Sequence, residues 1–193
     1  VVVVENYELD DRSVKFLMNA IGCFGNLLKI VVNFNLQRVF VEMQNAHQAN
    51  LVRLYLDGFD YFGCQLKVRH APINCLRKPD VLEDSGIKFY ELENWTFRFK
   101  RHLSIKFNPP SKMLHFTSLS SRIDHLILFS IISQIHEPLK MYKLNQNFSQ
   151  SQMFLAEFNS VNESLEVLSV LHNKILDKKS LKISFPHPKI SGH

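Results

Sequence analysis

The chain has 193 residues, a formal net charge of +5, and apolar side chains at 46% of its positions. This composition is sufficient for one or two packed cores, and the modest positive charge permits a polyanionic partner without requiring one. No apolar run approaches the roughly 18 residues that a membrane-spanning helix needs, so we expect no membrane partner.

The first half of the chain predicts a β-α-β-β-α-β order of elements. The β-branched start VVVVENY suits a strand, and we expect this strand to begin inside a longer protein. Apolar residues at helical spacing follow Asp10 and Asp11, and Gly25 is expected to end that helix. The runs KIVVNF and RVFVEM predict two strands, NAHQANLVRLYL a second helix, and CQLKVRH a last strand.

The second half repeats this order. Its segments are MLHFTSL, a helix through IDHLILFSII, LKMYKLN, MFLAEF, the helix VNESLEVLSVLH, and LKISF. Residues 39–70 align with residues 154–185 without a gap, and Glu42 falls on Glu157 and Lys67 on Lys182. Two copies at this distance are too few for a solenoid. We therefore predict one domain over residues 1–78, a linker over 79–111, and a second domain over 112–190.

The β-α-β-β-α-β order predicts an α+β fold of the ferredoxin-like type in each copy. Both helices cover one face of a four-stranded antiparallel sheet, and the other face stays open, as in RNA-recognition motifs. The same fold also hosts enzymes and protein-interaction modules, so the residues on the open face must decide the function.

RNA-recognition motifs stack bases on aromatic rings at three positions of the two central strands. Strand alternation assigns these positions to Val3, Arg38 and Phe40 in the first copy and to His115, Met153 and Leu155 in the second. Only Phe40 keeps an aromatic ring, although His115 can also stack on a base. An exposed methionine and leucine suit either a pyrimidine face or a protein partner.

Further residues on the predicted sheets suit contacts with RNA phosphates and pyrimidine edges. In the first copy these are Val31, Asn33, Lys67 and Arg69, and in the second Lys143, Lys182 and Ser184. The alternative is that the lysines and the arginine are ordinary solvated surface residues. Because the cations recur at equivalent positions of both copies, the pattern favours binding.

Several segments resemble, in order, one family of RNA-binding proteins. They include GCFGNLLKI, VFVEMQNAHQANL, LDGFDYFGCQLKV, EDSGI, PPSKMLHF and LHNKILDKKSLKISF. The chain is similar over nearly its full length to the C-terminal pair of RNA-recognition motifs of the polypyrimidine-tract-binding family, and more distantly to those of hnRNP L.

This resemblance implies a function, a location and an arrangement of domains. It implies binding of single-stranded, pyrimidine-rich RNA in splicing regulation, with splicing co-regulator proteins as further partners. It also implies a nuclear location with shuttling to the cytoplasm. The two domains would pack through their helices and the linker, with their sheets facing apart, and residues 73–76 (INCL) would form a fifth strand.

The predicted linker is too apolar for a free tether. Leu76 lies shortly before the linker, and the apolar residues within it are Val81, Leu82, Ile87, Phe89, Tyr90, Leu92, Trp95, Phe97, Phe99, Leu103, Ile105 and Phe107. We expect these side chains to pack inside the protein, and the alternative is that they contact a separate protein.

The sequence carries no signature of an enzyme. It has no Gly-rich phosphate loop, no HExxH and no nucleophile elbow, and its histidines lack metal-ligand spacing. Three cysteines without a CxxC spacing predict free thiols in the core. We predict no catalysis, cofactor, metal or small-molecule substrate. A competing hypothesis is a degenerate pair of RNA-recognition motifs that acts as a protein-interaction scaffold with little RNA affinity.

Overall fold

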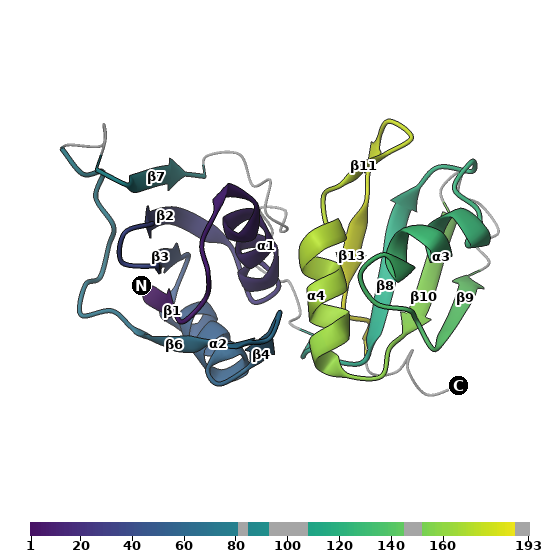
Figure 1. The fold of residues 1–193 in the computed structure, drawn as a ribbon, viewed down its shortest axis with the longest axis horizontal. Helices are drawn as coiled ribbons and strands as arrows, with labels where there is room; N and C mark the ends of the chain where they lie inside the picture. Colours follow the sequence, from purple (N-terminus) through teal and green to yellow (C-terminus); the bar gives the residue numbers. More distant parts are fainter. Residues whose placement is uncertain (81–84, 93–107, 145–151, 188–193) are drawn as a thin grey trace. The chain divides into compact units, whose positions relative to one another are not determined.

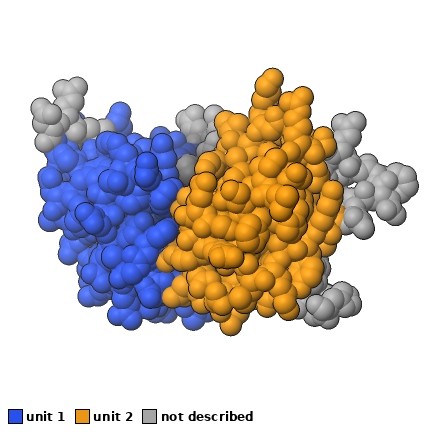
Figure 2. Space-filling model, turned by 45° about the vertical axis from the view of Figure 1, so that its right-hand side comes forward, with its two compact units in different colours: residues 1–107 blue, residues 108–193 orange. Residues whose placement is uncertain are grey.

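A computed structural model describes residues 1–80, 85–92, 108–144 and 152–187 of the chain. The chain divides into two compact units, Val1–Phe107 and Asn108–His193, which Figure 2 colours separately. Each unit contains helices and an antiparallel sheet.

The first unit contains a five-stranded sheet with two helices on one side (Figure 1). Its strands lie in the order β6-β1-β3-β2-β7, and all neighbours are antiparallel. The elements are β1 (Val2–Glu5), α1 (Asp11–Ile21), β2 (Leu27–Asn33), β3 (Arg38–Met43), α2 (Ala46–Leu56), the short hairpin β4 (Asp60–Tyr61) and β5 (Cys64–Gln65), β6 (Lys67–His70) and β7 (Ile87–Glu91).

The first helix begins as its acidic start predicts but ends earlier than expected. The carboxylate of Asp10 accepts a hydrogen bond from the backbone N–H of Ser13, and the Ser13 hydroxyl accepts one from the N–H of Asp10. This reciprocal cap satisfies N–H groups that a helix start leaves unpaired. The helix ends at Ile21 with Gly22 as its cap, so the prediction that Gly25 ends it is wrong.

The alternation within β3 builds the core between the sheet and the helices. Val39, Val41 and Met43 are at most 5% exposed and point toward the helices. Arg38 and Phe40 alternate with them and therefore lie on the other face, as predicted. From α1, Val14 and Leu17 are among the side chains that complete this core.

The prediction of a fifth strand at residues 73–76 is wrong. The fifth strand is β7, which pairs with the outer edge of β2, from Lys29 opposite Glu91 to Asn33 opposite Ile87. To reach that edge from β6, residues 71–79 run across the open face of the sheet, a path that Figure 1 shows on the side away from α1 and α2. We call residues 71–79 the crossing segment. Part of the predicted linker therefore belongs to the first sheet.

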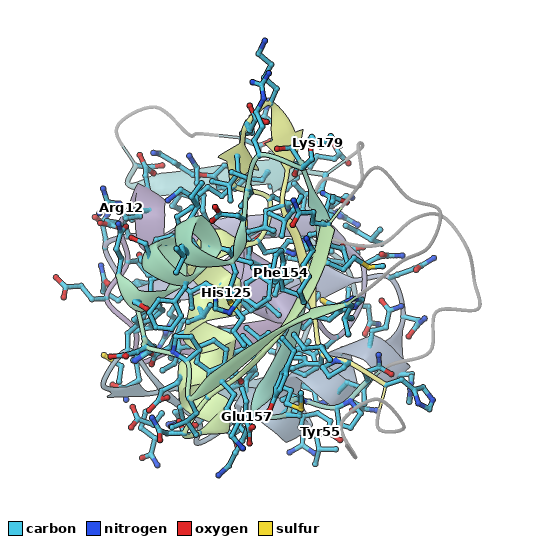
Figure 3. The ribbon with its side chains drawn as sticks, turned by 90° about the vertical axis from the view of Figure 1, so that its right-hand side faces the viewer. Arg12, Tyr55, His125, Phe154, Glu157 and Lys179 are labelled. Carbon is cyan, nitrogen blue, oxygen red and sulfur yellow. The ribbon has the colours of Figure 1, made fainter. Side chains whose placement is uncertain are left out.

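The second unit repeats the arrangement with four strands in the order β13-β8-β10-β9. His125 lies beside Phe154 in Figure 3, with ring centroids 6.3 Å apart, where α3 covers the inner face of the sheet. The elements are β8 (Met113–Leu119), α3 (His125–Ser133), β9 (Lys140–Leu144), β10 (Gln152–Glu157), α4 (Val161–Leu171), the short hairpin β11 (Ile175–Leu176) and β12 (Lys179–Ser180), and β13 (Lys182–Ser184).

Both units therefore have the ferredoxin-like fold of an RNA-recognition motif, which confirms the predicted fold class. The internal repeat is also visible, because β3, α2 and β6 correspond to β10, α4 and β13. The expectation that the linker packs rests mainly on residues 93–107, which lie outside the described residues. Of the three free cysteines only Cys23 is buried, whereas Cys75 is exposed, so the prediction of three core thiols is wrong.

Candidate nucleic-acid interface

A row of side chains crosses the middle of the open face in the first unit. Strand register places Arg69, Val3, Phe40, Val31 and Phe89 side by side on β6, β1, β3, β2 and β7. The two phenylalanines flank Val31 and lie two strand spacings apart, about 10 Å. Phe40, Val31 and Phe89 are half-buried, so part of each phenylalanine ring is exposed to a ligand.

A charged row lies beside this central row. Oε1 of Glu5 forms an ion pair with Nε of Arg38 at 2.6 Å, and it accepts a hydrogen bond from Nη2 of Arg69 at 2.8 Å. The Glu5 side chain is only 12% exposed, whereas those of Arg38 and Arg69 are 42% and 53% exposed. Lys67 pairs with Glu5 in the strand register and is exposed. Both predicted arginines are thus bound to a carboxylate that sequence reasoning missed.

The charged row borders a groove at the edge of the sheet. The groove has a volume of about 620 Å³, and Glu5, Arg38 and Lys67 line it together with Leu36 and Gln37 of the β2–β3 loop. The nearby Asn33 uses its side-chain oxygen to accept the backbone N–H of Leu36 at 2.9 Å, which ties the loop to β2. The groove is therefore polar, and two carboxylates, those of Glu5 and Asp57, line it beside the two cations.

The crossing segment covers the other end of this face. The backbone N–H of Leu76 donates to Oε2 of Glu42 at 2.6 Å, and Nζ of Lys29 donates to the Leu76 carbonyl at 3.3 Å. The Leu76 side chain is 4% exposed. A pocket of about 460 Å³ lies between this segment and Val31. The acidic Glu42 on the sheet thus anchors the chain's own crossing segment.

The second unit carries an equivalent central row. Register aligns Ser184, His115, Leu155 and Tyr142 on β13, β8, β10 and β9. His115 and Tyr142 flank Leu155 as the two phenylalanines flank Val31 in the first unit. Nε2 of His115 finds no hydrogen-bond partner among the described residues, and burial lowers the pKa of this imidazole. The neutral ring is the form suited to stacking on a base.

A second row continues on the same face. Met153 pairs with Leu144, and Lys182 pairs with Thr117. The Lys182 amine donates to the side-chain oxygen of Asn173, and burial lowers the pKa of this amine. The predicted residues Met153, Lys182 and Ser184 therefore share one face with His115.

Lys143 does not share that face. It pairs with Phe154, which points toward the helices, so Lys143 lies on the helix side of the edge strand and the prediction that it lines the open face is wrong. The neighbouring Tyr142 lies on the open face instead and is 46% exposed. A shift of one residue reverses the face of every side chain in a strand, and only the pairing with β10 determines it.

Two predicted contacts offer almost no surface to a ligand. Val3 is 4% exposed and Leu155 is 5% exposed. Val3 lies between Arg69 and Phe40 in its row, and Leu155 lies between His115 and Tyr142. Sequence reasoning also missed Phe89, because it assigned the fifth strand to residues 73–76.

Within the described residues, no group of three or more histidine, cysteine, aspartate or glutamate side chains is arranged to hold a metal ion. In the same part of the chain, no helix has the length and apolarity to cross a membrane.

Comparisons with known proteins give structural neighbours only. No protein-family model matches the sequence, and a search of curated proteins finds no match. The structure of an Rna15 RRM with bound RNA (GU) has 14% identity and a TM-score of 0.36, and the alignment covers 40% of this chain and 84% of that one. The Pes4 RRM3 structure has 10% identity and a TM-score of 0.37, and the alignment covers 40% of this chain and 93% of the Pes4 chain. The structure of the N-terminal three RNA binding domains of the yeast splicing factor Prp24 has 11% identity and a TM-score of 0.37. That alignment covers 96% of this chain and 66% of the Prp24 chain.

Proposed function

We propose that this chain binds single-stranded, pyrimidine-rich RNA through the open faces of its two sheets. The observation that carries the proposal is the central row found on both faces, in which two rings flank an aliphatic side chain. Base stacking on such rings contributes about 1–3 kcal/mol per base and tolerates differences in sequence. Cations lie next to each row, with Arg38, Arg69 and Lys67 in the first unit and Lys182 in the second.

The sequence resemblance supports the preference for pyrimidines. In the first unit the crossing segment covers the end of the face near Glu42, so a base meets a short platform between Phe40 and Phe89.

The proposal extends to the cell. We assign the protein to splicing regulation and related RNA processing, in the nucleus with passage to the cytoplasm, and in contact with splicing co-regulator proteins. Imaging of the tagged full-length protein tests the location, and a distribution confined to the cytoplasm would contradict it.

A titration by fluorescence anisotropy tests the binding itself. A CU-repeat RNA and an A-only RNA of equal length are compared for the wild type, Phe40→Ala and Tyr142→Ala. We expect tighter binding of the CU repeat, and a loss of about 5- to 150-fold in each variant whose ring carries a base. Phe62→Ala is the control, because Phe62 is 37% exposed but lies in the β4–β5 turn and stacks on Phe16.

The same titration separates this function from the competing one. Equal, weak binding of both RNAs, unchanged by Phe40→Ala and Tyr142→Ala, would contradict RNA recognition. A protein-interaction scaffold would then be the better account.

A further inference from the structure

Glu5 occupies an unusual place for an acidic residue on a surface proposed to bind RNA. Its carboxylate lies between the two guanidinium groups of the first sheet, and a single oxygen, Oε1, forms ion pairs with both, at 2.6 Å with Arg38 and at 2.8 Å with Arg69. Ion pairs that are partly buried are screened by salt much less than fully exposed ones. With 12% of its side chain exposed, Glu5 is shielded from competing solvent.

This arrangement changes what the arginines offer to RNA. A phosphate that approaches Arg38 or Arg69 must compete with a carboxylate that already lies in place. The same carboxylate lines the groove beside Arg38 and Lys67 and repels a phosphate there. Phosphate contacts carry no sequence information, whereas the rings of the central row contact bases.

We infer that Glu5 sets the RNA selectivity of the first sheet by withholding Arg38 and Arg69 from RNA phosphates. This inference rests on the proposed function. Glu5 acts through the two arginines and is therefore a positioning residue. Glu5 lowers the affinity of the first sheet for any polyanion. Contacts between RNA bases and the rings of Phe40 and Phe89 then determine which RNA binds.

The salt dependence of binding measures this role directly. For single-stranded nucleic acid, the logarithm of the binding constant falls with the logarithm of the salt concentration by about 0.7 per phosphate contact. Glu5→Gln keeps the shape of the side chain and removes its charge, so one or two arginines become available. We expect the slope to steepen by about 0.7 to 1.4. We also expect the A-only RNA to bind more tightly and the ratio of CU-repeat to A-only affinity to fall.

A matched control separates this local effect from a change in net charge. Glu8→Gln makes the same charge change at an exposed residue that forms no ion pair with any of the described residues. Its slope should equal that of the wild type. Thermal unfolding checks that each variant is folded.

A second variant keeps the inference testable if Glu5→Gln does not fold. Because Arg38 is bound to Glu5, Arg38→Gln in the wild-type background should leave the slope nearly unchanged. In the Glu5→Gln background the same substitution should remove about 0.7 of the added slope. A drop of about 0.7 on Arg38→Gln alone would overturn the inference, because Arg38 would then already contact a phosphate.

The outcomes distinguish the inference from the proposed function. If the wild type prefers the CU repeat and Glu5→Gln changes neither slope nor preference, the inference is wrong and the proposed function stands. If the wild type binds neither RNA, the proposed function fails, and the inference fails with it.

Discussion

Leu76 anchors the crossing segment to the first sheet, and replacing it by alanine tests that anchor. The Leu76 side chain is 4% exposed, its N–H donates to Glu42 at 2.6 Å, and its carbonyl accepts from Lys29 at 3.3 Å. Leu76→Ala removes the buried side chain and keeps the backbone groups that make both hydrogen bonds.

The expected cost follows from the position of the residue. Burying a leucine side chain contributes about 1.5–3 kcal/mol, and leucine-to-alanine changes in rigid cores cost about 2–5 kcal/mol. The crossing segment lies on a surface and can move closer to the sheet after the substitution. The cost of Leu76→Ala should therefore lie at the lower end of this range. We expect the free energy of unfolding of the first unit to fall by about 2 kcal/mol.

Two measurements check this value. Urea unfolding gives the change in free energy, and amide hydrogen exchange at residue 76 reports whether its N–H stays bound to Glu42. We expect faster exchange at this amide in the variant than in the wild type. Leu54→Ala is the control, because Leu54 on α2 is 66% exposed and its loss should change the stability by less than about 0.5 kcal/mol. Equal stabilities and equal exchange in the two variants would refute the anchoring role of Leu76.

Two further predictions concern the second unit. Burial lowers the pKa of His115 from its ordinary value of 6.5, so the unfolded chain takes up this proton first as the pH falls. The contribution of the neutral imidazole to stability is complete above pH 6.5 and declines as the pH falls toward the lowered pKa. Unfolding titrations across this range should show the decline in the wild type but a weaker one in His115→Gln, and identical profiles would contradict the assignment. Ser160 caps α4 by accepting the N–H of Glu163 at 3.1 Å, so Ser160→Ala should lower the free energy of unfolding by about 1 kcal/mol and Ser160→Gly by a few tenths, as chemical denaturation can measure. Equal losses in the two variants would argue against the cap.

Much of the fold was predictable because its signals are local. The strand RVFVEM alternates between buried and open positions, and β3 spans those residues, Arg38–Met43. The helix predicted from VNESLEVLSVLH is α4, Val161–Leu171. Two copies of one pattern also predicted two sheets of the same kind, which the strand orders confirm.

The candidate site was only partly predictable, because its geometry depends on partners distant in the sequence. Sequence alternation assigned Phe40 and His115 to the open faces, since each lies on a central strand with a clear pattern. It misplaced Lys143, because β9 is an edge strand whose face depends on its pairing with β10.

The sequence by itself determined the order of helices and strands, the internal repeat, and the open-face positions of Phe40 and His115. Short-range periodicity decides these features, since side chains in a strand alternate regardless of which strand lies beside it. Only the tertiary structure decided that β7 forms the fifth strand, that Leu76 binds Glu42, and that Glu5 joins Arg38 to Arg69. These contacts join residues more than 30 positions apart, and their geometry exists only after the strands have paired.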